Sequence, residues 1–286
     1  MTFGRAALLG CGMVGGSLMA ALRTAGAVER VIGFDRDPAH GRAAQRRGFV
    51  DETAADAAGA ARGCELVVLA VPVGATAELC AAIAPVVAGA RLITDVGSTK
   101  LAVVTAAERA LGHGARFCGA HPMAGTEKSG PDAADAALFT GRLAIITPSA
   151  HTAPDALAAC EALWAAVGAR TVRLGAAEHD RAMAWVSHLP HAAAFALAAA
   201  VGGVATDVVG LSGGGFVDTT RVAASDGAMW RDIFLANRGP LLDALDALAG
   251  ELAALRHAVA SGDGAALELL MSRARDGRRR VMAARP

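Results

Sequence analysis

The sequence predicts an α/β fold, with a parallel sheet and crossover helices over residues 1–175 and an all-α second domain over residues 176–286. Between Arg5 and Leu174, short β-branched or apolar runs alternate with alanine-rich helical periods, which is typical of a parallel sheet. After Ala176 the strand-like runs stop, and long helical periods continue to the end of the chain. We therefore expect two domains that join near residues 175–178.

The predicted strands of the first domain are short apolar runs, each followed by turn residues. They lie near residues 5–10, 30–35, 65–71, 91–95, 116–119, 142–147 and 170–174. Glycine-rich breaks separate the later helices at residues 210–215, 239–240 and 262–264. The longest apolar run, residues 189–205, falls short of the roughly 20 residues that span a bilayer, so we expect a helix buried on most sides, with a second subunit as one way to cover it. Pro190 should kink that helix.

The composition favours a small-molecule substrate. The chain of 286 residues has 27 basic and 27 acidic residues, so no global field attracts nucleic acid or an anionic membrane. The N-terminus does not have the pattern of a secretory signal, which favours the cytoplasm. Cysteines are scattered without metal-like spacing, so we expect buried thiols and no metal site. The cysteines are Cys11, Cys64, Cys80, Cys118 and Cys160.

A glycine turn follows the first predicted strand. Residues 10–15 read G-C-G-M-V-G and open a helical period that runs through Leu22. The first glycine allows the tight turn, the second lets a pyrophosphate approach the backbone, and the third lets helix and strand pack closely. This strand, turn and helix predict a Rossmann-type dinucleotide-binding domain. The expected cofactor contacts are Gly10, Gly12, Met13, Val14 and Gly15.

The second predicted strand ends in Asp35, 20 residues after Gly15. A carboxylate there accepts hydrogen bonds from the ribose hydroxyls of adenosine and repels a 2′-phosphate, so NAD is expected rather than NADP. The neighbouring Arg36 is also expected at the cofactor and leaves the strictness of that preference open. Val71 and Pro72 end a buried strand at the same crevice and are expected to flank the nicotinamide, with ordinary packing as the alternative.

Two polar segments follow later strands. Residues 95–100 read D-V-G-S-T-K and place Ser98 at the edge of the sheet near the nicotinamide, with helix capping as the alternative. Residues 121–130 read H-P-M-A-G-T-E-K-S-G. His121 follows the predicted strand near residues 116–119, close to the expected hydride acceptor, so it could take a hydroxyl proton as hydride leaves the same carbon, with a purely structural histidine as the alternative. Lys100 and Lys128 are the only lysines of the chain, and each lies in one of these segments.

Two segments of the helical half carry candidate substrate contacts. Residues 187–191 read S-H-L-P-H, which places Ser187 and His191 on one helix face. Residues 213–221 read G-G-G-F-V-D-T-T-R and predict a loop that leads into a helix. Arg221 would there hold a carboxylate through two hydrogen bonds.

In this order, the glycine turn, D-V-G-S-x-K, H-P-M-A-G-T-E-x-S-G, S-H-L-P-H, G-G-G-F-x-D-x-T-R and M-W-R-D-I resemble the prephenate and arogenate dehydrogenases of tyrosine biosynthesis. The resemblance covers nearly the whole chain. It implies an NAD-dependent oxidative decarboxylation of prephenate, arogenate or both. Hydride passes from the ring carbon that bears the 4-hydroxyl to NAD⁺, and the ring carboxylate leaves as CO₂.

The resemblance also implies roles for individual residues. His121 accepts the hydroxyl proton, Ser98 orients His121 and the hydroxyl, and Arg221 binds the side-chain carboxylate. Ser187 and His191 contact the substrate from the helical domain, which forms an intertwined homodimer. Further positions that line or gate the pocket are Thr126, Glu127, Asp180, Asp218 and Trp230. Some relatives have a basic residue where this chain has Val217, so an ionic latch is not expected.

Two other functions stay open at this point. A β-hydroxyacid or imine-type reductase would pair the same two domains, but such enzymes use a lysine on the first long helix of the second domain, and this chain has no lysine after Lys128. A non-catalytic NAD-binding module would leave His121, Ser98 and Arg221 without a purpose. No residue distinguishes the keto side chain of prephenate from the amino side chain of arogenate.

Overall fold

The computed structural model describes residues 1–112, 116–125, 128–204 and 209–284. The chain forms two compact units, Met1–Arg238 and Gly239–Pro286. The domain boundary expected after residue 175 falls inside the first unit, and it stays a prediction.

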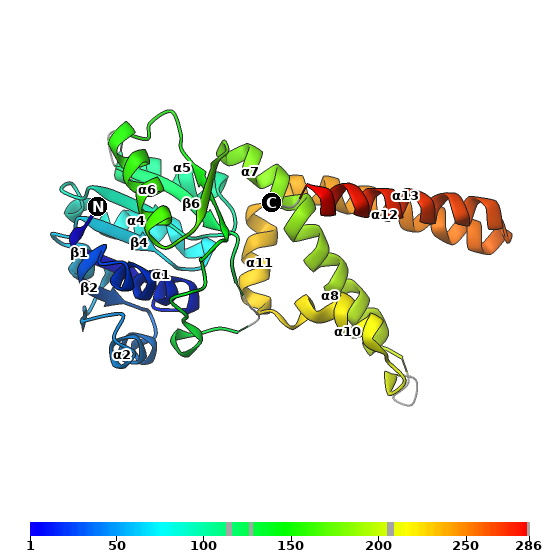
Figure 1. The fold of residues 1–286 in the computed structure, drawn as a ribbon, viewed down its shortest axis with the longest axis horizontal. Coiled ribbons are helices and arrows are strands. Elements are labelled where there is room, and N and C mark those ends of the chain that lie inside the picture. Colours follow the sequence, from blue (N-terminus) through cyan, green and yellow to red (C-terminus); the bar gives the residue numbers. More distant parts are fainter. Residues whose placement is uncertain (113–115, 126–127, 205–208, 285–286) are drawn as a thin grey trace. The chain divides into compact units, whose positions relative to one another are not determined.

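A sheet of eight strands forms the centre of the first unit, in the order β3-β2-β1-β4-β5-β6-β7-β8. Figure 1 labels β1, β2, β4 and β6 of this sheet, with helices beside them. The strands are β1 (Phe3–Leu9), β2 (Val28–Phe34), β3 (Glu52–Thr53), β4 (Leu66–Leu69), β5 (Leu92–Asp95), β6 (Phe117–Pro122), β7 (Leu143–Thr147) and β8 (Arg170–Arg173). The first six strands have the order of the Rossmann fold. The predicted α/β class is therefore confirmed.

Two features of the sheet differ from the prediction. β3 has two residues and no apolar run, so no sequence pattern marks it. β7 runs antiparallel to β6, with His121 opposite Ile145. The described part of the connection from β6 to β7 contains the short 3₁₀ turn Pro131–Ala133 instead of a crossover helix, so the chain turns back beside β6. The expectation of a wholly parallel sheet is wrong at this strand.

Helices cover both faces of the sheet, and β1 shows how its side chains divide between two cores. Ala6 and Leu8 belong to one cluster, whereas Ala7 and Leu9 belong to the other, because successive strand residues point to opposite faces. The first cluster includes α1 (Met13–Thr24), α2 (Pro38–Arg46) and α6 (Pro154–Ala166). The second includes α3 (Ala57–Ala61), α4 (Thr76–Ile83) and α5 (Leu101–Leu111).

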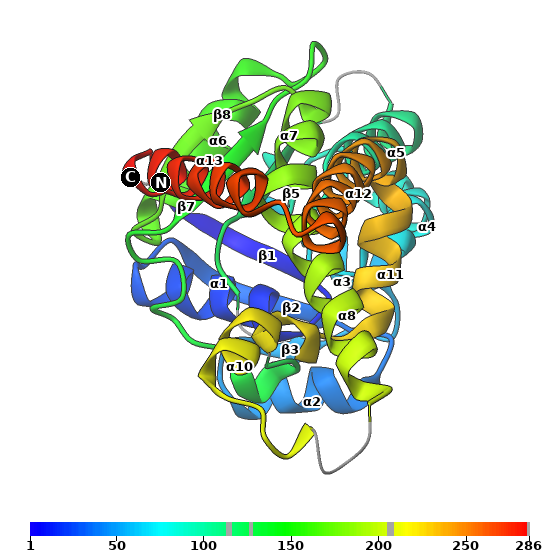
Figure 2. The same cartoon turned by 90° about the vertical axis from the view of Figure 1, so that its right-hand side faces the viewer.

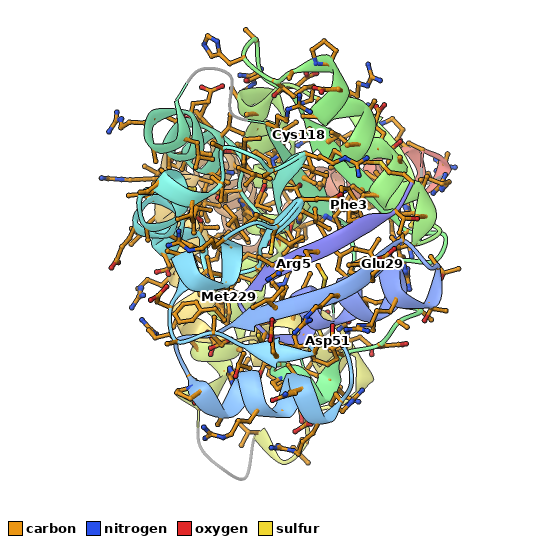
Figure 3. The ribbon with its side chains drawn as sticks, turned by 90° about the vertical axis from the view of Figure 1, so that its left-hand side faces the viewer. Phe3, Arg5, Glu29, Asp51, Cys118 and Met229 are labelled. Atoms are coloured by element: carbon orange, nitrogen blue, oxygen red, sulfur yellow. The ribbon has the colours of Figure 1, made fainter. Side chains whose placement is uncertain are left out.

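All five cysteines are buried free thiols, as expected. One of them, Cys118, lies on β6 and is labelled in Figure 3. Burial raises the pKa of the Cys11 thiol to about 12. Cys11 is therefore a packing group instead of a nucleophile.

One continuous helix, Ala176–Gly202, follows the sheet, and it comprises α7 (Ala176–Met183), a π-helical turn (Ala184–His188) and α8 (Leu189–Gly202). It has 27 residues and is long and apolar enough to cross a membrane by length and composition, so the expected shortness of this segment is wrong. Only 17% of its apolar window is buried within the chain, so the expectation of a helix buried on most sides is wrong for a single copy. Pro190 lies just after the π-helical turn. Because proline has no backbone N–H, it cannot donate an α-helical hydrogen bond at this position.

The first unit ends with α10 (Gly214–Thr220), a 3₁₀ turn (Arg221–Ala224) and α11 (Gly227–Ala236). The predicted loop over residues 213–221 is thus wrong, because a helix begins at Gly214. The second unit is a hairpin of α12 (Arg238–Ser261) and α13 (Gly264–Ala283), which lie side by side in Figures 1 and 2. Gly262, with φ of +68°, makes the predicted break between them.

Candidate active site

The three glycines of the turn between β1 and α1 have different surroundings. Gly10 has a φ of +100°, and a Cβ there would lie 2.2 Å from the carbonyl oxygen of Ala70. A Cβ on Gly15 would lie 2.7 Å from the Cβ of Ala70, so this glycine lets α1 pack against β4. A Cβ on Gly12 would meet nothing within 4 Å. Gly12 thus leaves space for a ligand at the uncapped N-terminus of α1, where N–H groups favour phosphate.

A cavity of about 320 Å³ opens beside this turn. Its lining includes predicted cofactor residues and Ser98, namely Gly12, Met13, Val14, Gly15, Val71, Pro72 and Ser98. Met229 (labelled in Figure 3) and Ile233 of α11 also line it, so the helical half contributes to the cavity. The residues present fit a dinucleotide, since a phosphate-binding helix end and an apolar slot share one cavity.

Asp35 follows β2 and is held by the turn itself. Its Oδ2 accepts the N–H of Cys11 at 2.8 Å, and its Oδ1 accepts the N–H of Asp37 at 2.9 Å. His40 lies near the same carboxylate, with Nδ1 3.6 Å from Oδ1. Arg36 is exposed beside it. The carboxylate is thus fixed next to the glycine turn, as the prediction for the adenosine ribose requires.

His121 lies near the end of β6 and is only 7% exposed. Its Nδ1 is 2.8 Å from Nε2 of His179, and the two rings meet edge to face. Nδ1 of His179 is 2.8 Å from Oδ1 of Asp180. Asp180 also accepts the backbone N–H groups of Lys100 at 2.7 Å and Leu101 at 2.9 Å. A chain of three buried side chains therefore connects β6 through α7 to the start of α5.

The surroundings favour the neutral form of His121, at one end of this hydrogen-bonded chain, and the ionised form of Asp180, at the other. Burial lowers the pKa of His121 well below its usual value, and the positive charges of His179, Lys100 and His188 would lower it further. Burial alone would raise the pKa of Asp180, but the hydrogen bonds from His179 and from two backbone N–H groups outweigh it, so that pKa is lowered. At neutral pH His121 is neutral and Asp180 is a carboxylate.

A buried ion pair between Lys100 and Asp95 fixes the Ser98 segment to β6. Lys100 Nζ contacts Asp95 Oδ2 and donates to the carbonyl oxygen of Ala120 at 2.9 Å. Asp95 Oδ1 accepts the N–H of the same Ala120 at 3.1 Å. Because Ala120 precedes His121, this pair sets the position of Ser98 relative to His121.

Three predicted substrate residues come together on the helical side. The rings of His191 and Trp230 are stacked, with centroids 3.7 Å apart. Burial lowers the pKa of His191, the hydrogen bond of its Nδ1 to the Ser187 carbonyl opposes this, and the charge of Arg221 lowers it again. Ser187 therefore contacts His191 through its backbone. The buried indole N–H of Trp230 has no hydrogen-bond partner in the described structure.

Other predicted residues are placed differently. Thr126 and Glu127 lie outside the described residues, and Asp218 is exposed on α10. His121 is not among the residues that line the cavity, and no described hydrogen bond joins it to Ser98. The sequence interpretation also missed His179, His188 and Asn237. Asn237 donates to the carbonyl oxygen of Asp180 at 2.7 Å and to Nδ1 of His188 at 2.9 Å. The sequence signal that could have revealed this cluster is the adjacent pair His179 and Asp180, two polar residues that can form a hydrogen bond.

Comparisons with known proteins agree with this arrangement. Residues 18–173 match the nucleotide-binding domain of prephenate dehydrogenase, and residues 175–273 match its dimerization domain. The chain is 36% identical to the cyclohexadienyl dehydrogenase of Zymomonas mobilis, over 92% of this chain and 90% of that one. It is 34% identical to the prephenate dehydrogenase of Bacillus subtilis, over 95% of this chain and 74% of that one.

Solved structures give the same result. Prephenate dehydrogenase from Aquifex aeolicus, in complex with hydroxyphenyl propionate and NAD⁺, has a TM-score of 0.90 and 32% identity. The match covers 100% of this chain and 99% of that one. Arogenate dehydrogenase from Synechocystis has a TM-score of 0.79 and 27% identity, over 97% and 99% of the two chains.

Proposed function

The chain belongs to the prephenate dehydrogenase family and is an NAD-dependent dehydrogenase, and from that premise we propose that it oxidatively decarboxylates prephenate, arogenate or both. The observation that carries this proposal is His121. It is a neutral, buried base at the end of β6, and the Lys100–Asp95 pair fixes it relative to the cavity-lining Ser98.

Each group of residues has a part in that reaction. The glycine turn holds the pyrophosphate, and Asp35 with Arg36 meets the adenosine ribose. NAD⁺ supplies the hydride acceptor when bound. His121 takes the proton of the 4-hydroxyl, and Ser98 orients that hydroxyl. Residues of the helical side hold the rest of the substrate, with Arg221 on the side-chain carboxylate.

The remaining substrate contacts follow from the same assignment. His191 and Trp230 form one wall of the substrate site, Ser187 supports His191, and Thr126 and Glu127 close the pocket. Cleavage of the ring carboxylate needs no further acid, because aromatisation of the ring drives the loss of CO₂.

We further propose a homodimer in the cytoplasm, with residues 1–175 as the NAD-binding domain and residues 176–286 as the substrate and dimerisation domain. The exposed apolar side chains of the long helix support this, since Trp185 and Val186 are at least half exposed. A second copy would cover such a surface. Light scattering at micromolar concentration should give twice the mass of the chain, and a monomeric mass would contradict the dimer.

The purified protein should be assayed for NADH and CO₂ with prephenate and with arogenate, each against NAD⁺ and NADP⁺. We expect one NADH and one CO₂ per substrate molecule, and a clear preference for NAD⁺ because Asp35 repels a 2′-phosphate. NAD⁺ binding without turnover of either substrate would favour a binding module. Turnover only of β-hydroxyacids or imines would favour the reductase alternative.

A further inference from the structure

We propose that His179 and Asp180 form a buried proton relay behind His121. This relay sets the tautomer of His121, and during turnover it receives the Nδ1 proton of His121. The inference rests on the proposed function in one respect, that His121 is the base. Its geometric part, the tautomer, stands on the described contacts alone. His179 and Asp180 act through His121 and are positioning residues.

The tautomers follow from one fixed acceptor. Asp180 accepts two backbone N–H groups at the start of α5 and is a carboxylate, so it can only accept from Nδ1 of His179, 2.8 Å away. A neutral His179 that donates through Nδ1 presents a lone pair at Nε2. That lone pair faces Nδ1 of His121 at 2.8 Å, so Nδ1 of His121 must donate. His121 then has an unprotonated Nε2, which is the atom that a base needs.

The same contacts provide a path for the proton. The hydroxyl O–H bond of the substrate breaks and a bond from that proton to Nε2 of His121 forms. The Nδ1–H bond of His121 breaks and a bond from its proton to Nε2 of His179 forms. The positive charge then lies on the imidazolium that touches Asp180. Hydride leaves the ring carbon that bears the hydroxyl with the C–H bonding pair, for which NAD⁺ would be the acceptor, and the electron pair of the broken O–H bond forms the C=O bond. The bond between the ring and its carboxylate then breaks, CO₂ leaves, and that bonding pair passes through the ring to the oxygen. The two proton transfers reverse to give the phenol, so the relay is restored.

The charges around the two rings favour this destination. Lys100 donates to the carbonyl oxygen of Ala120, the residue before His121, and its positive charge opposes a cation on the His121 ring. His179 lies against the Asp180 carboxylate, and it is fully buried, so the attraction is weakly screened. A relay therefore lets a buried base accept a proton without keeping the charge. Catalytic triads use a carboxylate behind a histidine for a related purpose.

Nitrogen NMR of the ¹⁵N-histidine-labelled protein tests the tautomer without any turnover. Two-bond correlations between ring carbon-bound protons and nitrogens distinguish the two tautomers, and a His121→Asn variant assigns the His121 signals by their loss. We expect a protonated Nδ1 and an unprotonated Nε2 on His121 at neutral pH, and the same tautomer on His179. A protonated Nε2 on His121 would overturn the proposal.

Variants of His179 test the catalytic part. His179→Leu, which removes the acceptor, should lower kcat about 10²-fold and leave the KM for NAD⁺ unchanged. His179→Gln should recover part of that loss, because its amide oxygen can accept from Nδ1 of His121 but cannot take the proton. An unchanged kcat in folded His179→Leu would overturn the relay.

Asn237→Ala is the matched control, since it removes buried hydrogen bonds to the backbone of Asp180 and to His188 but leaves the side chains of His121, His179 and Asp180 in place. It should lower Tm and keep the His121 tautomer. A changed tautomer in this control would overturn the assignment to His179. A wild-type protein with the expected tautomer but no NADH formation from either substrate would contradict the proposed function, while the tautomer would stand.

Discussion

The cofactor side and the buried polar side of this site are built in different ways. The glycine turn uses six consecutive residues, and its second glycine faces open space. The buried side joins groups that are far apart in the chain: His121 meets His179, 58 positions later, and the N–H of Lys100 meets Asp180, 80 positions later. Local sequence order specifies the first side, and tertiary packing specifies the second.

The largest expected effect is on the buried side, where His121→Asn removes the base. We expect kcat to fall about 10²- to 10⁴-fold, the usual range for loss of a general base. The Kd for NAD⁺ should stay unchanged, because His121 does not line the cavity. Steady-state kinetics and calorimetric titration measure the two. A near-normal kcat would show that the buried side takes no part in the chemical step.

Removal of the buried cation tests whether the same side carries stability. Lys100→Met should lower the free energy of unfolding by about 3–5 kcal/mol, because it leaves the Asp95 carboxylate buried without its ion-pair partner. Arg30→Met is the control, since its ion pair with Glu52 is exposed and should be worth about 1 kcal/mol or less. Urea unfolding measures both. Equal losses in the two variants would contradict the contrast between buried and exposed charges.

Most of the fold and of the cofactor side could be predicted from the sequence, whereas the contacts of the buried side could not. The alternation of strand and helix, the glycine turn and Asp35 are local patterns, and the structure has them where they were expected. β3 was missed because two polar residues carry no strand pattern, and the antiparallel β7 because no local signal gives strand direction. His179 and Asn237 were missed for a third reason, since their partners are defined only once β6, α5 and α7 pack together.

Arg221→Gln tests the helical side of the substrate site. Loss of a hydrogen-bonded charge pair with the substrate carboxylate should raise the KM roughly ten- to hundredfold. The kcat should change little, because that contact is the same in the ground state and the transition state. A fall in kcat with no change in KM would contradict the assignment and place Arg221 at the reacting ring. Initial rates over a range of substrate concentrations distinguish the two outcomes.

Gly12→Val tests the open side of the contrast. A Cβ there meets no protein atom within 4 Å, so we expect Tm to stay unchanged, while the KM for NAD⁺ should rise about tenfold or more because the side chain fills the space for the pyrophosphate. Gly10→Ala is the contrasting variant, since its Cβ meets backbone at 2.2 Å and should lower Tm. If Gly12→Val lowers Tm as much as Gly10→Ala, the cofactor side is not open.

The smallest effect is a pH dependence of stability to which the histidines of the buried side contribute. Burial lowers the pKa of His188 to about 4, and that of His121 is lowered as well, whereas an unfolded histidine titrates near 6.5. Between those values the unfolded chain binds more protons, so the free energy of unfolding falls as pH falls from about 6.5 toward 4. Each histidine contributes at most about 1.4 kcal/mol per pH unit. His188→Gln should make that slope shallower in urea unfolding at a series of pH values. An unchanged slope would mean that His188 is solvated in the folded protein, and the buried side would then be more open than its contacts indicate.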